Sequence, residues 1–396
     1  MRGIWIGWLL ASAIAYGADQ TPSELLTRIR AQMTQTLARL PDYTCRETIQ
    51  RSVKDNASSP LEERDLIRVE VAYLGGRELY AWPGSSAFGS QGLAEMIPGG
   101  SIGTGNFGAL SRDVFTTQAA TFIFKGRSTV NGRHEARFDF TVPAAKSRYV
   151  IRYAKAAAIV PYQGWFTADT DTYDVIDFEV DADDIPEKLE TRRGEEHVQY
   201  VRLRIAGGDY LLPQTSDTLL ADPSGGMSRN HITIEGCREY SGQATVKFTD
   251  PDLPAVAPSA GLTRELPPGV QLEIRLDTPI RRGVTAIGDV VSGEVLRAVR
   301  RPVMIPKGAK AALRVTRMEI ADSRRARAQV LSFALLNVQA GGVEYDVKAA
   351  ELESASGIAR YQVAPGGVLA FWGSSFQIQP GLRMLWRVRK PPKANP

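Results

Sequence analysis

The residues whose types and spacing could carry chemistry include a glycine-rich hexapeptide. Gly103-Thr104-Gly105-Asn106-Phe107-Gly108 has the spacing of a dinucleotide-binding fingerprint. That fingerprint works where a buried parallel strand leads into a helix whose N-terminus holds the pyrophosphate. Here the preceding residues are Pro98-Gly99-Gly100-Ser101, with no apolar strand. We therefore expect a glycine-rich loop and no nicotinamide cofactor.

An acidic run between residues 169 and 184 could indicate calcium. An EF-hand loop needs a central glycine and a glutamate at its twelfth position, but a loop counted from Asp169 has Asp174 and Val180 at these places. Turns and outward-facing strand positions account for most of these carboxylates. We therefore expect no resident metal and no cofactor.

The chain has few signs of an enzyme. Neither a Ser-x-x-Lys pair nor a His-Glu-x-x-His helix occurs, and these spacings activate a serine or hold a hydrolytic zinc. The prediction is that the protein is not an enzyme. A hydrolase whose site is assembled in space from distant residues stays open as a third class of function.

The first seventeen residues have the layout of a secretory signal peptide. An apolar run, Ile4 to Ile14, follows a basic N-terminus and precedes small residues at Ala15 and Gly17. The run is too short for a lasting anchor in a bilayer core of about 30 Å. We predict cleavage after Gly17 and a secreted protein that is periplasmic or associated with the outer envelope.

The two cysteines, Cys45 and Cys237, are expected to form a disulfide bond. An even pair in an exported chain is usually bridged, and closing so long a loop stabilises the fold by roughly 4–5 kcal/mol on the entropic model. The alternative is two separate buried thiols. The three histidines, His134, His197 and His231, have no zinc-ligand spacing.

Charge is distributed unequally along the chain. The net charge is +4, but residues 261–396 carry 21 Lys or Arg against 11 Asp or Glu, so residues 1–260 are acidic. A basic C-terminal part favours an anionic membrane surface or an acidic envelope protein as partner. Nucleic acid is not expected, because only Phe333 and Tyr345 interleave the basic clusters between 271 and 360.

One amphipathic helix should open the mature chain. Thr21-Pro22-Ser23-Glu24 supplies an N-cap, a first-turn proline and a capping-box glutamate, and apolar residues then recur at helical spacing as far as Leu40. Pro41 follows and should end the helix.

The hydrophobic period changes to two from Cys45 onward. Alternation from Ile67 to Tyr73, turn signals at Gly75-Gly76 and Asn131-Gly132, and an acidic turn at 169–172 predict antiparallel hairpins with one apolar face each. The helix should cover that face. The predicted fold class is α+β, with an N-terminal helix on a curved antiparallel sheet that forms a half-barrel.

Composition divides the chain into domains. Residues 84–112 are rich in glycine and serine and predict a long loop with a short helix near 110–115. Five prolines between 251 and 269 predict a linker. Residues 21–250 should then form the half-barrel domain, and residues 270–390 a basic, small all-β barrel or sandwich.

Residues 164–171 read Gly-Trp-Phe-Thr-Ala-Asp-Thr-Asp, and Ile176-Asp177-Phe178-Glu179 and Asp184-Ile185-Pro186 follow. With the capped helix and the one-sided strands, this segment resembles the strand, acidic turn and strand of the bacterial lipoprotein-carrier superfamily of half-barrels. The resemblance covers most of residues 21–250. It implies an incomplete barrel that cups acyl chains beneath helices.

Four segments of the second domain occur in a characteristic order: Leu266-Pro267-Pro268-Gly269-Val270, Leu276-Asp277-Thr278-Pro279, Gly288-Asp289 and Ile305-Pro306-Lys307-Gly308-Ala309. This series is similar to the β-domain of the outer-membrane-channel component of type IV secretion and conjugation machinery. The resemblance implies a β fold and an envelope setting.

These observations predict an exported envelope protein that binds an apolar ligand, a lipid or an acyl chain, in the half-barrel and docks through its basic β-module. The alternative is a structural or protein-interaction component of a cell-envelope assembly, whose half-barrel is filled by its own side chains. An exposed apolar groove would favour the first. The expected ligand-lining residues are Ile67, Val69, Val71, Tyr73, Phe138, Phe140, Ile176 and Phe178.

Overall fold

The computed structural model describes residues 20–391, apart from 76, 86, 90, 98, 100–109, 154–155, 241–261, 324–325, 358–360, 365–366 and 373–376. The predicted signal peptide and most of the predicted linker lie outside the described residues. No helix in the described part of the chain is long and apolar enough to cross a membrane.

Helix α1 (Pro22–Arg39) begins at the predicted capping box. The Thr21 hydroxyl accepts the backbone N–H of Glu24 at 3.3 Å, and the Glu24 carboxylate accepts the N–H of Thr21 at 3.0 Å. These bonds satisfy two amide groups that a helix N-terminus otherwise leaves unpaired. Leu25, Ile29 and Met33 are buried, so one narrow apolar stripe faces the sheet.

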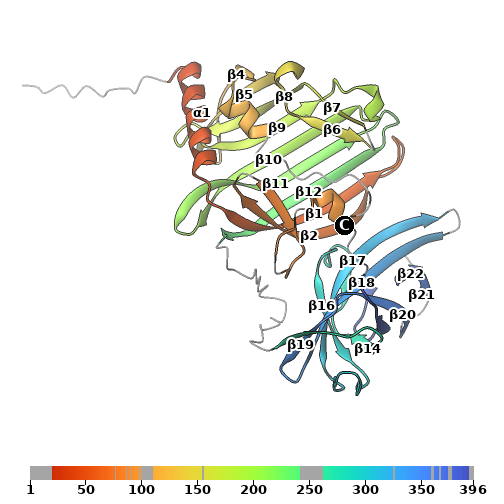
Figure 1. The fold of residues 1–396 in the computed structure, drawn as a ribbon. Coiled ribbons are helices and arrows are strands. Elements are labelled where there is room, and N and C mark those ends of the chain that lie inside the picture. Colours follow the sequence, from red (N-terminus) through yellow and green to blue (C-terminus); the bar gives the residue numbers. More distant parts are fainter. Residues whose placement is uncertain are drawn as a thin grey trace, which may run out of the picture.

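Ten antiparallel strands form the sheet of the N-terminal domain, in the order β3-β2-β1-β12-β11-β10-β9-β8-β5-β4. Figure 1 shows this sheet as a broad curved surface with α1 along one side. The strands are β1 (Tyr43–Lys54), β2 (Glu62–Leu74), β3 (Arg77–Ala81), β4 (Thr121–Val130), β5 (Arg133–Val142), β8 (Tyr162–Asp169), β9 (Val175–Ala182), β10 (Arg193–Ile205), β11 (Gly208–Ala221) and β12 (Met227–Glu239).

Short elements lie between these strands. The loop region that the sequence places at 84–112 contains α2 (Leu93–Met96), and helical turns follow from Leu110 into the π-helical segment η1 (Arg112–Thr116). This agrees with the short helix predicted near 110–115. The others are η2 (Ala144–Lys146), the pair β6 (Val150–Tyr153) and β7 (Ala156–Ile159), and η3 (Glu187–Leu189).

The β4–β5 hairpin turns where the sequence predicts it. Asn131 and Gly132 have φ angles of 52° and 81°, and a two-residue turn between twisted strands needs two successive residues with positive φ. Asparagine and glycine tolerate this conformation best, which is why the dipeptide predicts the turn.

The predicted disulfide bond is confirmed. Cys45 of β1 and Cys237 of β12 are bridged, with their Cα atoms 4.1 Å apart. The two strands are sheet neighbours, so the bond joins an early strand of the domain to its last one. The disulfide therefore holds the first and the last strand of this sheet next to each other.

A second β domain follows, drawn in cyan to blue in Figure 1. Its main path runs β13-β19-β18-β17-β16-β14-β24-β20, and β22 pairs with β18 and β21. The strands are β13 (Thr263–Glu265), β14 (Gln271–Leu276), β15 (Ile280–Arg281), β16 (Val290–Val295), β17 (Lys310–Ser323), β18 (Ala326–Ala340), β19 (Val343–Asp346), β20 (Ala350–Ser356), β21 (Tyr361–Ala364), β22 (Val368–Trp372), β23 (Gln377–Ile378) and β24 (Arg383–Val388).

The predicted fold class is wrong in two respects. The described residues lie mostly in strands, and α2 and η1 join α1 as helical segments, so the chain is mostly β and not α+β with a single helix. The second domain is not a small barrel, because its sheet is built on two strands of 14 and 15 residues. Short alternating runs in the sequence merge into these long strands, and register bulges let one strand carry several runs.

The described end of the predicted linker belongs to the second sheet. Residues Thr263–Glu265 form β13, which pairs in parallel with β19. The N–H of Leu266 then donates to the carbonyl of Asp346 at 2.8 Å. The sheet therefore uses backbone groups that lie before residue 270.

Candidate functional site

Five phenylalanines fill one half of the concave face. The rings of Phe138 and Phe166 stack with centroids 5.4 Å apart, and those of Phe140 and Phe178 stack at 5.5 Å. Phe115 enters from η1 and meets the Phe166 ring edge-on at 5.0 Å. All five side chains are at most 2 % exposed. Among the described residues, this part of the interior is therefore a packed aromatic core.

Described parts of the segment between β3 and β4 form a cover, called the cover below. Phe115 of η1 packs on the aromatic core, and Leu93, Ile97, Leu110 and Val114 of the same segment are also buried. Arg30 of α1 fastens η1 to the helix, because its guanidinium donates to the carbonyl of Phe115 at 3.1 Å. The loop that interrupts the strand pattern thus returns apolar residues to the half-barrel.

A cavity of about 580 Å³ lies among the described residues at the C-terminal end of α1. Its wall combines the end of the helix, the edge formed by β1, β2 and β3, and the facing strands β10 and β11. The lining side chains are mainly apolar or aromatic, with charged groups from Asp42, Glu78, Arg112 and Arg148. The other lining residues are Met33, Leu37, Leu40, Pro41, Tyr43, Tyr73, Gly75, Ser111, Tyr200, Leu211, Leu212 and Pro213.

Tyr73 is the one member of the predicted ligand-lining set that borders this cavity. Ile67, Val69 and Val71 are fully buried on β2, and Phe138, Phe140 and Phe178 belong to the aromatic core. Ile176 is half-buried, because a bulge pairs Ala168 with Val175 and leaves Ile176 out of the register. The structure brings six of these residues into one apolar core, and their role as ligand contacts stays a prediction.

Buried carboxyl and phenol groups lie beside the cavity. Glu47 projects inward from β1 and is fully buried, and Tyr73 donates a hydrogen bond to its Oε1 at 3.5 Å. Burial raises the pKa of Glu47 to about 8, and the charge of Glu78 adds to this rise. Tyr80 donates to the Glu78 carboxylate at 2.8 Å, while burial raises the pKa of Glu78. Uncharged carboxyl groups are therefore favoured here.

Two arginines lie at the rim of the cavity, Arg112 on η1 and Arg148 between η2 and β6. Arg148 lies 3.5 Å from the buried Asp113 and leaves most of its side chain in solvent, and Arg112 is exposed next to it. The backbone N–H of Arg148 also donates to Asp113 at 3.1 Å. The cavity thus has a mainly apolar lining and exposed cationic groups at its rim.

The acidic turn has a structural explanation. One oxygen of Asp169 accepts the backbone N–H groups of Asp171 and Thr172, both at 2.8 Å. This is the usual role of aspartate in a tight turn. Among the described residues no group of histidine, cysteine and acidic side chains is arranged to hold a metal ion.

Sequence reasoning missed the cavity because its wall comes from the ends of elements. Leu37 and Leu40 belong to the last turn and cap of α1, and Leu211 and Leu212 are adjacent residues on β11. Adjacent apolar residues do not follow a period of two, so alternation does not select both. The available signal in the sequence was the pair Leu211-Leu212 directly before Pro213, which breaks the alternation of the strand.

The glycine-rich segment contains one further motif that could carry chemistry. Gly99-Gly100-Ser101-Ile102-Gly103 has the spacing of a nucleophile elbow, and all of it except Gly99 lies outside the described residues. An elbow requires a strand, a sharp turn and a helix in this order. The element described before Gly99 is the helix α2 and not a strand.

Comparisons with known proteins find similar solved structures. No protein-family model matches the chain, and no curated protein matches it. A DUF1329 family protein from Desulfovibrio piger is similar over 57% of this chain and 96% of its own, with 14% identity and a TM-score of 0.30. A LolA superfamily protein from Nitrosomonas europaea is similar over 55% and 94%, with 11% identity and a TM-score of 0.30.

A third solved structure is lipoprotein LppX of Mycobacterium tuberculosis, with 13% identity, a TM-score of 0.21 and coverage of 56% of this chain and 98% of that chain. The names of these neighbours agree with the expected resemblance to lipoprotein carriers. Likeness at these values carries no argument about function, so the proposal below depends on the residues of this chain. The resemblance of the second domain to secretion channels stays a prediction.

Proposed function

We propose that this chain is an exported envelope protein, not an enzyme, that binds one acyl chain or a similar apolar ligand in the cavity at the end of α1. The observation that carries the proposal is the cavity itself. Its volume of about 580 Å³ lies within the usual 300–1,000 Å³ of small-molecule sites. Its mainly apolar lining and the exposed arginines at its rim suit a ligand with an apolar body and a polar end.

The physical drive for such binding is the burial of apolar surface. Each methylene group that moves from water into an apolar site contributes about 0.8 kcal/mol. Eight methylenes would contribute roughly 6 kcal/mol before the cost of ordering the ligand is subtracted. The leucines of α1 and β11 can provide this contact, whereas the five phenylalanines already pack against one another.

A charge placed on the wall tests the proposal. Leu37 is half-buried and borders the cavity, so Leu37→Glu should lower the affinity for a fluorescent fatty acid at least tenfold. Leu26 is half-buried on the same helix and lies outside the cavity wall, so Leu26→Glu is the matched control and should bind as the wild type does. Equal affinity in the wild type and Leu37→Glu, or no binding by the delipidated wild type, would contradict the proposal.

A second candidate is a structural or protein-interaction component of a cell-envelope assembly. The aromatic core favours it, because Phe115 from η1 already packs against Phe166 and Phe178 in the interior. The two candidate functions differ in whether the cavity at the end of α1 holds a ligand. Failure of every acyl probe to bind the delipidated protein would favour this second one.

The basic second domain would supply docking in either case. Arg297, Arg300 and Arg301 are exposed on one loop, and Met304 on the same loop is 75 % exposed. Arginines beside an exposed apolar side chain suit an anionic membrane surface, where each cation contributes about 1 kcal/mol. Flotation with vesicles that contain phosphatidylglycerol tests this. Arg300→Glu with Arg301→Glu should abolish flotation, and persistence of flotation would exclude this loop.

A further inference from the structure

The second domain docks on the N-terminal sheet at an uncovered part of β2. Strand β3 pairs with β2 only from Glu70 to Leu74. Ile287 of the second domain takes the edge next to it: its N–H donates to the carbonyl of Leu66, and its own carbonyl accepts the N–H of Arg68, both at 2.8 Å. An open sheet edge presents unpaired backbone groups, and this bridge satisfies two of them.

Charged pairs and close packing surround the bridge. Arg68 pairs with Asp289, and the Nε of Arg282 lies 3.4 Å from the carboxylate of Glu63. Gly288 packs directly on the sheet, because a Cβ atom there would lie 2.2 Å from the carbonyl oxygen of Arg68 and 2.9 Å from the ring of Trp82. Only glycine therefore permits this close approach, and its φ of +103° also favours glycine.

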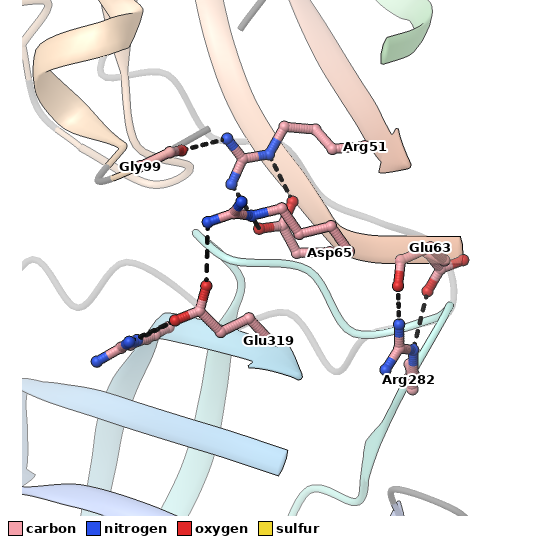
Figure 2. A network of polar contacts seen from close by, with 8 residues as sticks. Arg51, Glu63, Asp65, Gly99, Arg282 and Glu319 are labelled. Carbon is pink, nitrogen blue, oxygen red and sulfur yellow. Dashed lines mark hydrogen bonds and ion pairs between the residues drawn. The ribbon is translucent and has the colours of Figure 1, made fainter. Parts of the chain in front are cut away.

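A chain of polar contacts continues from this interface to the cover of the half-barrel (Figure 2). Glu319 of β17 accepts a hydrogen bond from Arg64 at 3.4 Å, and the Nε of Arg64 lies 3.7 Å from Asp65. Asp65 holds the guanidinium of Arg51 through two nitrogens, one of them at 2.6 Å. Arg51 in turn donates to the carbonyl of Gly99 at 2.7 Å.

The far end of this chain of contacts is the part of the cover that contains α2. Gly99 lies two residues after Ile97, and Ile97 and Leu93 are buried in the core. The side chains of Arg51 and Asp65 are 3 % and 1 % exposed. The Gly99 carbonyl accepts one N–H of this buried guanidinium, and its removal would leave that charged donor without an acceptor in a poorly solvated place. Movement of Gly99 therefore disturbs the ion pair between β1 and β2, the strand on which the second domain docks.

We propose that docking of the second domain on β2 holds α2, Ile97 and Gly99 closed over the concave face, so that separation of the domains and opening of this cover form one linked equilibrium. Linkage acts in both directions: whatever opens the cover weakens docking, and a partner that pulls the second domain away opens the cover. This inference goes beyond the proposed function, because it concerns the protein without any ligand.

Hydrogen exchange of the full-length protein tests the linkage. Gly288→Ala should abolish docking, because its Cβ meets backbone that cannot move aside. Gly283→Ala is the matched control: this glycine also has a positive φ, of +73°, but nothing lies within 4 Å of the added atom. We expect amide exchange in Leu93–Met96 to become at least tenfold faster in Gly288→Ala and to change little in Gly283→Ala.

Two internal reporters make every outcome decisive. The amides of Arg68 and Ile287 report the docking bridge, and the amides of β14 report whether the second domain stays folded. If the amides of Arg68 and Ile287 stay protected in Gly288→Ala, the bulkier variant Gly288→Leu is used in its place. Faster exchange at α2 with β14 unchanged supports the proposal. Loss of protection at Arg68 and Ile287 with unchanged exchange at α2 overturns it, whether or not the protein binds a lipid.

Discussion

Tyr73 and Glu47 face each other inside the half-barrel, with the phenol oxygen 3.5 Å from the Glu47 Oε1. Tyr73 borders the cavity, whereas Glu47 is fully buried and its other carboxyl oxygen has no hydrogen-bond partner among the described residues. An ionised carboxylate is poorly stabilised at such a place. Burial accordingly raises the pKa of Glu47 from 4.5 to about 8.

Stability should therefore fall as the pH rises from 5 to 8. A carboxyl group whose pKa is raised in the folded protein contributes its full stability below the ordinary pKa near 4.5 and loses it as the pH passes the folded value near 8. Glu196, with a pKa of about 7, adds to the same trend. Glu47→Gln cannot ionise and should flatten the curve, by on the order of 2–4 kcal/mol at pH 8. Urea unfolding at several pH values measures this, and identical slopes in both proteins would contradict it.

Reduction of the Cys45–Cys237 bond should destabilise the N-terminal domain. The bond closes a loop with a sequence separation of 192, which corresponds to about 5 kcal/mol on the entropic model. Urea unfolding of Cys45→Ser with Cys237→Ser measures the loss. A double variant as stable as the wild type would show that neighbouring strands β1 and β12 need no covalent bond.

Substitution in the aromatic core should separate folding from binding. Phe138 is 2 % exposed and stacks on Phe166, so Phe138→Ala should cost about 3–5 kcal/mol of stability. The milder Phe138→Leu should keep the fold and leave the affinity for an acyl probe unchanged. A tenfold loss of affinity in Phe138→Leu at wild-type stability would place the ligand among the phenylalanines instead.

Proteolysis tests the domain boundary predicted from composition. Prolines and small residues between 251 and 269 offer little burial, so limited digestion should cut there first and release a basic C-terminal fragment. Mass spectrometry of the fragments locates the cut. First cleavage within 270–390 would contradict the boundary.

Mass spectrometry of the intact protein recovered from the periplasm tests the predicted signal peptide. The mature chain should begin after Gly17, and a chain that still carries Met1 would refute the signal peptide.

Local chemistry made several elements predictable from the sequence. The capping box at Thr21 and Glu24, the turn at Asn131-Gly132 and the pairing of Cys45 with Cys237 each depend on a few neighbouring residues or on a single possible pair. The alternation that predicted the strands also identified buried positions such as Phe138 and Phe178 correctly. These properties follow from the period of two and from turn chemistry.

The cavity and the domain contact could not be predicted in this way. Leu37 of α1 and Leu212 of β11 line the same cavity, and alternation carries no information about the sheet curvature that brings a helix and a distant strand to one cavity. The bridge between Ile67 and Ile287 depends on where β3 stops. A bulge such as the one at Ile176 changes the face of the sheet to which a side chain points, and the sequence carries no signal for it.

Photo-crosslinking measures most directly whether the cavity holds an acyl chain. The delipidated protein is irradiated with a diazirine-bearing fatty acid, and the modified peptides are identified by mass spectrometry. The account predicts adducts on peptides that contain Leu37 or Leu211 and Leu212, with their loss in Leu37→Glu and their retention in Leu26→Glu. No adducts at all, or adducts confined to peptides that contain Phe138 and Phe166, would contradict it.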